Sequence, residues 1–151
     1  DMPAQQDETL NIVRITKLAI EIFNEDYIYF FSDEEEIISK FDRTQLIRVV
    51  TNLVKNSIQA IEQKRPENPR IDVTVSTNEE ATKIVVKDNG IGIDKKYHHK
   101  IFKIFHALNK SKESSGIGLS IVKKVTDLYE GNVWAESEVN QGSTFFFTIK
   151  K

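Results

Sequence analysis

The sequence predicts an α+β fold, a two-layer sandwich in which a largely antiparallel sheet carries helices on one face. Apolar residues recur at helical spacing in three stretches and alternate with polar residues in several shorter stretches. Consecutive short stretches are separated by brief turns, which favours antiparallel pairing. The length of 151 residues fits a single domain that can bury its own core.

Composition excludes several classes of protein. The chain contains no Cys, so neither a disulfide framework nor a thiolate metal site can form. Its apolar runs are far shorter than the roughly 20 residues that span a bilayer. Lys and Arg total 21 and Asp and Glu total 23, a near balance that gives nucleic-acid binding little support. We therefore expect no nucleic-acid contact and no membrane contact from this segment.

The N-terminal third predicts one helix and two strands. Residues 1–8 are polar and are expected to form a lead-in to the domain. A helix is expected from Thr9, a suitable N-cap, because apolar residues recur on one face from there on. The aromatic stretch 27–32 predicts a strand, and 34–40 predicts a turn followed by a short strand.

The strongest helical pattern covers 43–63, where Asp42 is a suitable N-cap and Pro66 follows the end. Alternating apolar residues at 71–75 and 84–86 then predict an antiparallel pair of strands. The remaining elements are expected as a glycine-bearing loop (88–94), a short helix (95–105), a loop (106–115), a helix (116–129) with its C-cap signal at Gly131, and two strands (133–138 and 144–150).

Several common catalytic patterns are absent from the sequence. It contains no P-loop, no G-x-G-x-x-G fingerprint and no G-x-S-x-G elbow. His98, His99 and His106 lie close together but lack the spacing of a metal site, so surface positions are the simpler interpretation.

Asn52 and Asn56 lie four residues apart on the long helix, one above the other on the same face. They can be ordinary amides at the boundary of the core. Alternatively, they can offer a carboxamide oxygen to Mg²⁺, which prefers oxygen ligands and keeps water or phosphate in its other positions.

Asp88 opens the sequence Asp-Asn-Gly-Ile-Gly-Ile directly after a strand. Asp-Asn-Gly alone is typical of a turn. Two glycines spaced two apart also allow the backbone to approach a flat ligand, and the isoleucines add apolar surface. A carboxylate at this strand end can accept the amino group of adenine and reject guanine, which presents an acceptor there.

A third pattern, Gly116-Ile-Gly118, opens a helix after a stretch rich in Lys and Ser. It can be a flexible loop before a helix, or backbone N–H groups that bind phosphate. The fourth pattern begins at Gly142, where Ser, Thr and Phe follow; alone it is typical of a hairpin turn.

Together these patterns resemble the N, G1, F, G2 and G3 boxes of the catalytic and ATP-binding domain of sensor histidine kinases, in the GHKL superfamily. The resemblance extends from about Thr9 to Lys151. The stretches that carry it are RTQLIRVVTNLVKNSIQAI, VVKDNGIGID, KIFKIF, SGIGLSIVKKV and VWAESEVNQGSTFFFTI. It implies a Bergerat-type sandwich with a mixed, mostly antiparallel sheet of about five strands on three helices. Residues 9–151 would form one domain, and residues 1–8 would be the remnant of a link to absent dimerisation helices.

The resemblance also implies roles for individual residues. Asn56 would bind Mg²⁺, Asp88 would bind the adenine amine, and Thr144 would assist through water. Phe102 and Phe105 would form the F box that anchors the nucleotide lid. The implied ATP-binding residues are Asn52, Asn56, Asp88, Gly90, Gly92, Ile93, Phe105, His106, Lys110, Lys112, Gly116, Gly118, Leu119 and Thr144. No catalytic residue is assigned, because none of the three His lies in an acceptor motif such as H-E-x-x-x-P.

The sequence departs from the family pattern at four positions. Ser114 replaces the first Gly of the G2 box, and Gln59 stands where many members carry Lys. His106 and Ala107 stand where many members carry an aromatic residue and Arg. Stacking on adenine would then pass to His106, while the phosphate contact of the Arg would pass to a lid Lys or be lost.

The resemblance implies that the chain binds MgATP and transfers the γ-phosphoryl group to a His on a separate dimerisation domain, with a response regulator reached through that domain. The segment would be cytoplasmic, within a parent that can be membrane-anchored, and monomeric alone.

Three alternatives stay open. A GHKL ATPase is disfavoured because Asn52, a poor general base, stands where such enzymes carry Glu. A GHKL-type Ser/Thr protein kinase shares an external acceptor, and a degenerate nucleotide-binding or interaction module is suggested by the four departures.

Overall fold

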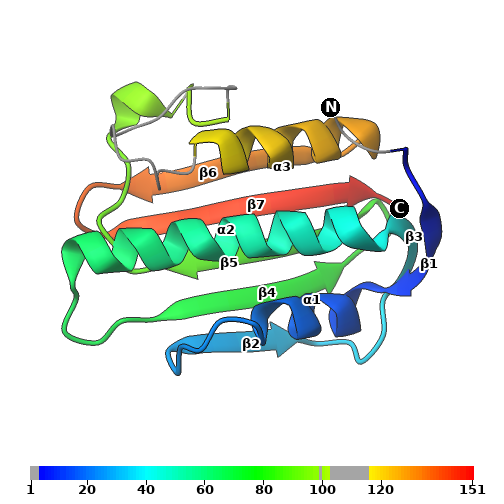
Figure 1. Ribbon diagram of the computed structural model, residues 1–151, viewed down its shortest axis with the longest axis horizontal. Helices are drawn as coiled ribbons and strands as arrows, with labels where there is room; N and C mark the ends of the chain where they lie inside the picture. The colour runs from blue at the N-terminus through cyan, green and yellow to red at the C-terminus, as the bar shows by residue number, and fades with distance from the viewer. Residues whose placement is uncertain (1–3, 99, 103–115) are drawn as a thin grey trace.

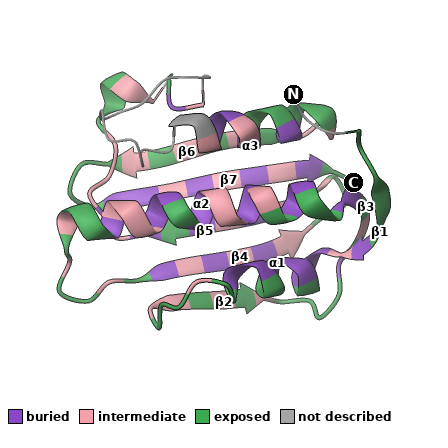
Figure 2. Cartoon of the chain, in the orientation of Figure 1, coloured by how far each residue is buried: buried purple, intermediate pink, exposed green. Residues whose placement is uncertain are grey.

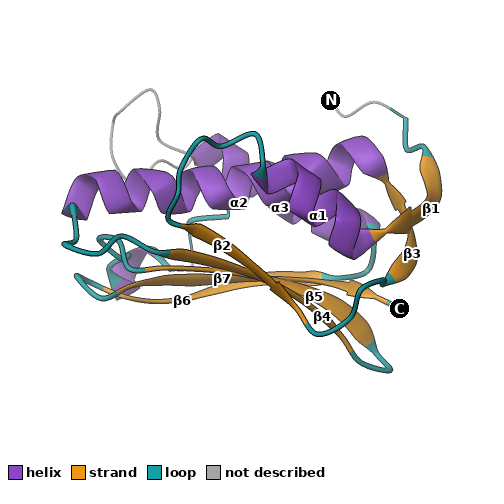
Figure 3. Cartoon of the chain, turned by 90° about the horizontal axis from the view of Figure 1, so that it is seen from below, coloured by secondary structure: helices purple, strands orange, loops and turns teal. Residues whose placement is uncertain are grey.

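A five-stranded sheet with three helices on one face forms the body of the molecule, which confirms the predicted fold class (Figures 1 and 3). The computed structural model describes residues 4–98, 100–102 and 116–151. Its elements are β1 (Asp7–Asn11), α1 (Ile12–Ile20), β2 (Ile28–Ser32), β3 (Ile38–Asp42), α2 (Arg43–Lys64), β4 (Ile71–Thr77), β5 (Ala81–Asp88), the 3₁₀ turn η1 (Lys95–Tyr97), α3 (Gly116–Leu128), β6 (Asn132–Glu138) and β7 (Gly142–Lys150).

The main sheet is mixed, with strand order β2-β4-β5-β7-β6. β2 runs parallel to β4, and the other neighbours are antiparallel. The parallel pair is possible because α2 carries the chain back along the helix face between these two strands. The hairpins β4–β5 and β6–β7 were both predicted from alternating apolar residues.

The first helix begins later than predicted. Thr9 lies in β1, which pairs antiparallel with β3 in a separate two-stranded sheet at one end of the molecule (Figure 1). The actual N-cap is Asn11, whose side chain accepts hydrogen bonds from the N–H groups of Val13 and Arg14. The predicted boundary after residue 8 therefore falls inside a strand, and Asp7 and Glu8 are part of the folded structure.

α2 follows the prediction closely. Asp42 caps its first turn by accepting from the Gln45 N–H at 3.1 Å. The helix ends at Lys64 because Arg65 adopts a left-handed conformation (φ 55°) and Pro66 cannot continue it.

Two other helix ends differ from expectation. The helix predicted over 95–105 is only the 3₁₀ turn η1 within the described residues, and 99 and 103–105 lie outside them. The loop predicted over 106–115 also lies outside. At the end of α3, the left-handed residue is Glu130 (φ 52°) rather than Gly131, whose N–H bonds the Thr126 carbonyl at 3.0 Å. Gly131 is required there for another reason, because a Cβ would lie 1.8 Å from the Thr148 carbonyl oxygen.

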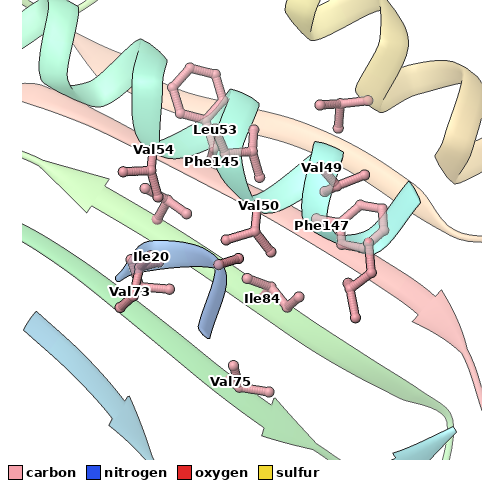
Figure 4. Packing of buried hydrophobic residues seen from close by; sticks show 14 of the residues in the cluster. Ile20, Val49, Val50, Leu53, Val54, Val73, Val75, Ile84, Phe145 and Phe147 are labelled. Carbon is pink, nitrogen blue, oxygen red and sulfur yellow. The ribbon is translucent and has the colours of Figure 1, made fainter. Parts of the chain in front are cut away.

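The core lies between the helices and the sheet. Burial alternates along β4, β5 and β7, as Figure 2 shows, so every second residue faces the helices. In Figure 4 the α2 residues Val50 and Leu53 pack above Val73, Ile84 and Phe147 of the sheet. This alternation decides which residues at the strand ends can reach the functional site. None of the helices in the described part of the chain is both long and apolar enough for a membrane crossing.

Candidate nucleotide-binding site

The predicted site residues come from four elements that meet at one end of the helix layer. α2 contributes Asn52 and Asn56, and the end of β5 contributes Asp88. The loop after β5 and the first turn of α3 contribute the glycines. The structure therefore brings together residues more than sixty positions apart in sequence.

Asp88 is the only carboxylate among the described residues of this group, and it is almost completely buried, with 4% exposure. Its Oδ1 accepts from the Gly90 N–H at 2.8 Å and from the Ser143 N–H at 3.3 Å. Burial raises the pKa of the Asp88 carboxyl group, while the hydrogen bonds from the Gly90 and Ser143 N–H groups and the nearby Ser57 hydroxyl partly lower this pKa. The carboxylate is thus fixed through one oxygen.

Three buried polar atoms of α2 and the end of β5 have no hydrogen-bond partner among the described residues: Asp88 Oδ2, Ser57 Oγ and Asn56 Nδ2. Ser57 lies close enough to influence the pKa of Asp88, but not in hydrogen-bonding geometry. Leaving such groups unpaired costs about 1–3 kcal/mol each, so a cluster of them indicates a place prepared for a polar ligand or water.

The loop after Asp88 is held tightly, which fixes the shape of the site. Gly90 lies against α2, where a Cβ would approach the Ala60 backbone to 2.5 Å, and the Ile91 N–H donates to the Ala60 carbonyl at 3.0 Å. Gly92 has φ +76°, and a Cβ there would lie 2.2 Å from the Glu138 carbonyl oxygen. Ile93 packs against the core, and its N–H donates to Ser137 Oγ at 2.7 Å.

The start of α3 lies directly against Asn52. A Cβ on Gly118 would lie 3.2 Å from Asn52 Oδ1, so a larger residue there would require a small shift of the Asn52 side chain. Gly116 is the first residue of α3, and Leu119 is buried in the core. The helix start thus offers backbone N–H groups next to a carboxamide oxygen.

The structure corrects the expectation for Thr144. Along β7, Ser143, Phe145 and Phe147 face the helices, whereas Thr144 lies on the opposite face and pairs with the exposed Lys87. The residue that meets Asp88 is Ser143, which is 4% exposed and lies directly across from it in the register. Strand alternation relative to Phe145 would have identified Ser143 from the sequence. Ser57 lies four residues after Leu53, so helical spacing predicts its burial on the core face of α2, but no motif marks it as a site residue.

The F box is partly visible. Phe102 packs edge-on against Phe145, with ring centroids 6.4 Å apart, beside the fully buried Ile101. The other predicted lid residues, Phe105, His106, Lys110 and Lys112, lie outside the described residues, as do Ala107 and Ser114.

Chemically, the arrangement suits a nucleotide. A buried carboxylate with one unpaired oxygen can accept an amino group, and the close glycine loop can admit a flat ring. Adjacent amides and a glycine-bearing helix start fit phosphate and a hard cation. The sandwich and this group of residues together fit a nucleotide-binding domain.

The family follows from comparison with known proteins. Residues 41–151 match the model of the family described as histidine kinase-, DNA gyrase B-, and HSP90-like ATPase. The chain belongs to this family, and its fold is that of a histidine kinase catalytic domain. It is 29% identical to the catalytic domain of histidine kinase ThkA, with a TM-score of 0.83, covering 97% of this chain and 98% of that one.

Curated relatives are sensor proteins much longer than this chain. Phytochrome-like protein Cph1 of Synechocystis sp. is 39% identical over 110 residues, which are 72% of this chain and 14% of that protein. Sensor histidine kinase WalK of Bacillus subtilis is 29% identical over 153 residues, covering 94% of this chain and 24% of that protein. The chain therefore spans less than a quarter of the length of these relatives.

Proposed function

We propose that this domain binds MgATP and transfers its γ-phosphoryl group to a histidine on a separate dimerisation domain of a two-component sensor kinase. The observation that carries the proposal is the buried Asp88 carboxylate, whose Oδ2 has no hydrogen-bond partner among the described residues. Family membership and the likeness to a histidine kinase catalytic domain support it.

Asp88 would recognise adenine. Its Oδ1 is occupied by the Gly90 and Ser143 N–H groups, which leaves Oδ2 to accept a hydrogen bond from the exocyclic amine. Guanine presents a carbonyl oxygen at the same position. Two acceptors would then face each other in a buried place, which costs several kcal/mol. Gly90, Gly92 and Ile93 would line the ring.

Asn56, assisted by Asn52, would hold Mg²⁺. A 180° rotation of the Asn56 amide places an oxygen where Nδ2 now lies without a partner, so the side chain fits a cation that prefers oxygen. When bound, Mg²⁺ neutralises phosphate charge. Gly116, Gly118 and Leu119, at the start of α3, would offer backbone N–H groups to the phosphates. We propose that Phe105, His106, Lys110 and Lys112 complete the site from the lid.

The transfer itself would rest on positioning and electrostatics. The bond from the γ-phosphorus to the bridging oxygen breaks and ADP departs. The unprotonated imidazole nitrogen of the acceptor would form the new bond to phosphorus with its lone pair, and the proton on the other ring nitrogen would pass to solvent. The residue one turn before Asn56 is Asn52, an amide that cannot act as the general base for water attack.

The proposal includes the surroundings of the domain. The domain from β1 onward would act as one catalytic unit, monomeric alone, joined through the residues before β1 to its own dimerisation and phosphotransfer domain in the cytoplasm. A response regulator would receive the phosphoryl group from that domain. The multidomain sensor kinases among its relatives support this organisation.

The experiment combines the domain, Mg²⁺ and ATP labelled at the γ-phosphorus with a histidine-bearing dimerisation domain from its parent kinase. We expect label on the dimerisation domain, in a linkage that acid hydrolyses and base preserves, as for a phosphorylated imidazole. The Asp88→Asn variant should transfer none. Release of inorganic phosphate without protein label would instead support an ATPase, and acid-stable label would support a Ser/Thr kinase.

A further inference from the structure

Tyr129, directly after α3, contacts three elements at once. Its ring stacks on the fully buried Phe41 at the end of β3, with centroids 3.8 Å apart and planes inclined by 18°. Phe41 in turn meets Phe147 of the main sheet edge-on. Aromatic packing therefore fixes the tyrosine ring on Phe41 and, through Phe41, against the main sheet.

The hydroxyl of Tyr129 is bonded in two directions. It accepts a hydrogen bond from the Asp42 N–H at 2.9 Å and donates one to the Asp7 carboxylate. Asp42 also caps α2 through Gln45 and accepts from the Gln6 N–H at 2.8 Å. We call Tyr129, Asp42 and Asp7 the Tyr129 latch, because these three residues join the end of α3, the start of α2 and β1.

The latch lies at the end of the two helices remote from the nucleotide site. Figure 1 shows that α2 starts at the end of the helix layer where α3 ends. Farther along the two helices, Asn52 of α2 lies against Gly118 of α3. Ten residues separate Asp42 from Asn52, and eleven separate Gly118 from Tyr129, so the latch and this contact are roughly 15 Å apart at 1.5 Å per residue. A helix transmits a displacement over such a distance as a stiff rod.

We propose that Tyr129 is a positioning residue for the phosphate side of the nucleotide site. This inference rests on the proposed function. The hydroxyl holds the end of α3 against α2, and so sets the separation of Gly118 from Asn52 at the other end. The adenine side is held without α3: Gly90 lies on Ala60, Ile93 bonds Ser137, and Asp88 bonds Ser143.

The test measures the affinity of the Tyr129→Phe variant and of the wild-type domain for two ligands. The first ligand is ADP in the presence of Mg²⁺, and the second is adenosine without Mg²⁺. Phenylalanine keeps the stack on Phe41 and removes only the hydroxyl, so the variant should fold. We expect ADP to bind about fivefold more weakly while adenosine affinity is unchanged, because only ADP uses the start of α3. A merely structural role would leave both affinities unchanged in the folded fraction or weaken both together.

Two further variants complete the test. Asp7→Ala removes the acceptor of the latch at an exposed position and should lower the affinity for ADP to a similar degree. Combining Asp7→Ala with Tyr129→Phe should lower that affinity no further. Thr77→Val is the matched control, since it removes a hydroxyl hydrogen bond in the β4–β5 hairpin, far from α3. It should lower thermal stability without changing either affinity.

Outcomes separate this inference from the proposed function. If wild-type protein binds no ADP, the proposed function fails and the latch inference fails with it. If wild-type protein binds ADP and Tyr129→Phe binds it equally well, the latch inference alone is overturned. Equal loss of ADP and adenosine binding would also overturn it.

Discussion

The side chain of Asp88 is a carboxyl group in a buried position, where ionisation is unfavourable. Burial raises the pKa of its carboxyl group, and only one of its oxygens is hydrogen-bonded within the described residues. A group with a raised folded-state pKa contributes stability below its unfolded pKa, and loses that contribution as pH rises through its folded pKa. At a pH above that folded pKa, the ionised carboxylate therefore lowers the stability of the free domain. A residue that costs stability and faces a cluster of unpaired atoms is typical of a binding site.

Replacing Asp88 by Asn should separate binding from stability. The Asn Oδ1 can keep the hydrogen bonds from Gly90 and Ser143, and its Nδ2 can donate toward the unpaired Ser57 hydroxyl. We expect an equal or higher thermal midpoint at pH 7, and ADP affinity at least about 100-fold lower, because two amino groups would then face each other. Calorimetric unfolding and ADP titration measure both. The stability difference should shrink in acid, where Asp88 is protonated; a less stable variant at pH 7 would contradict this account of the carboxylate.

Asn56 should govern the dependence on Mg²⁺. In the Asn56→Ala variant, we expect Mg²⁺ no longer to strengthen ADP binding, while adenosine binding persists, because the alanine removes the amide oxygen offered to the cation. Titration with and without Mg²⁺ measures this. As a control, Asn68→Ala removes an exposed amide outside the cleft. A variant at position 56 that keeps its full response to Mg²⁺ would place the cation elsewhere.

At the scale of elements, local signals determined what the sequence could predict. α2 was predicted almost to the residue because a cap, an apolar stripe and a following Pro all agree there. β1 was missed because its short, polar sequence pairs with β3 about thirty residues away, and no local pattern reports such pairing. Asn11 and Glu130 likewise took the capping roles predicted for Thr9 and Gly131, since tertiary contacts decide between neighbouring candidates.

Gly142 couples the start of β7 to Asp88. It has φ +124°, and a Cβ there would lie 2.0 Å from the Asp88 carbonyl oxygen. We expect Gly142→Ala to lower the free energy of unfolding by about 2 kcal/mol or more, because the backbone beside Asp88 must move. The same movement should lower the affinity for ADP.

Gly118→Ala provides the comparison for Gly142→Ala. Its backbone is helical and its nearest contact is the Asn52 side chain at 3.2 Å, so the domain should stay as stable while ADP binds more weakly. Urea denaturation of both variants measures the difference. Equal stability losses at the two positions would contradict the distinction.

At the scale of the whole molecule, the Tyr129 latch should give the domain an alkaline limit. Burial and the hydrogen bond to Asp7 raise the pKa of Tyr129 to about 12. Its contribution to stability should be fully present below pH 10, the unfolded value, and be lost as pH rises through 12. Thermal midpoints of wild-type protein and Tyr129→Phe, measured from pH 8 to 12, should therefore converge in alkali. A difference that stays constant would show that the hydroxyl does not titrate with folding.

The sequence motifs predicted which residues come together in the fold, but not which neighbouring residues face them. Asn52, Asn56, Asp88 and the glycines do converge, because each motif marks the end or the face of an element that the fold brings to one place. The structure places Ser143 rather than Thr144 opposite Asp88 on the face toward the helices, and a turn motif does not indicate which of the two residues faces that way. The proximity of Ser57 to Asp88 depends on the fold and could not be predicted from the helical spacing that places Ser57 on the core face.

The most direct test of the central claim is a calorimetric titration of the domain with ADP and with GDP, each with and without Mg²⁺. We expect ADP to bind, Mg²⁺ to strengthen it, and GDP to bind far more weakly or not at all, because Asp88 accepts from adenine and opposes the guanine oxygen. Equal binding of the two nucleotides, or no binding of either to folded protein, would contradict the proposal that Asp88 and its neighbours form an adenine nucleotide site.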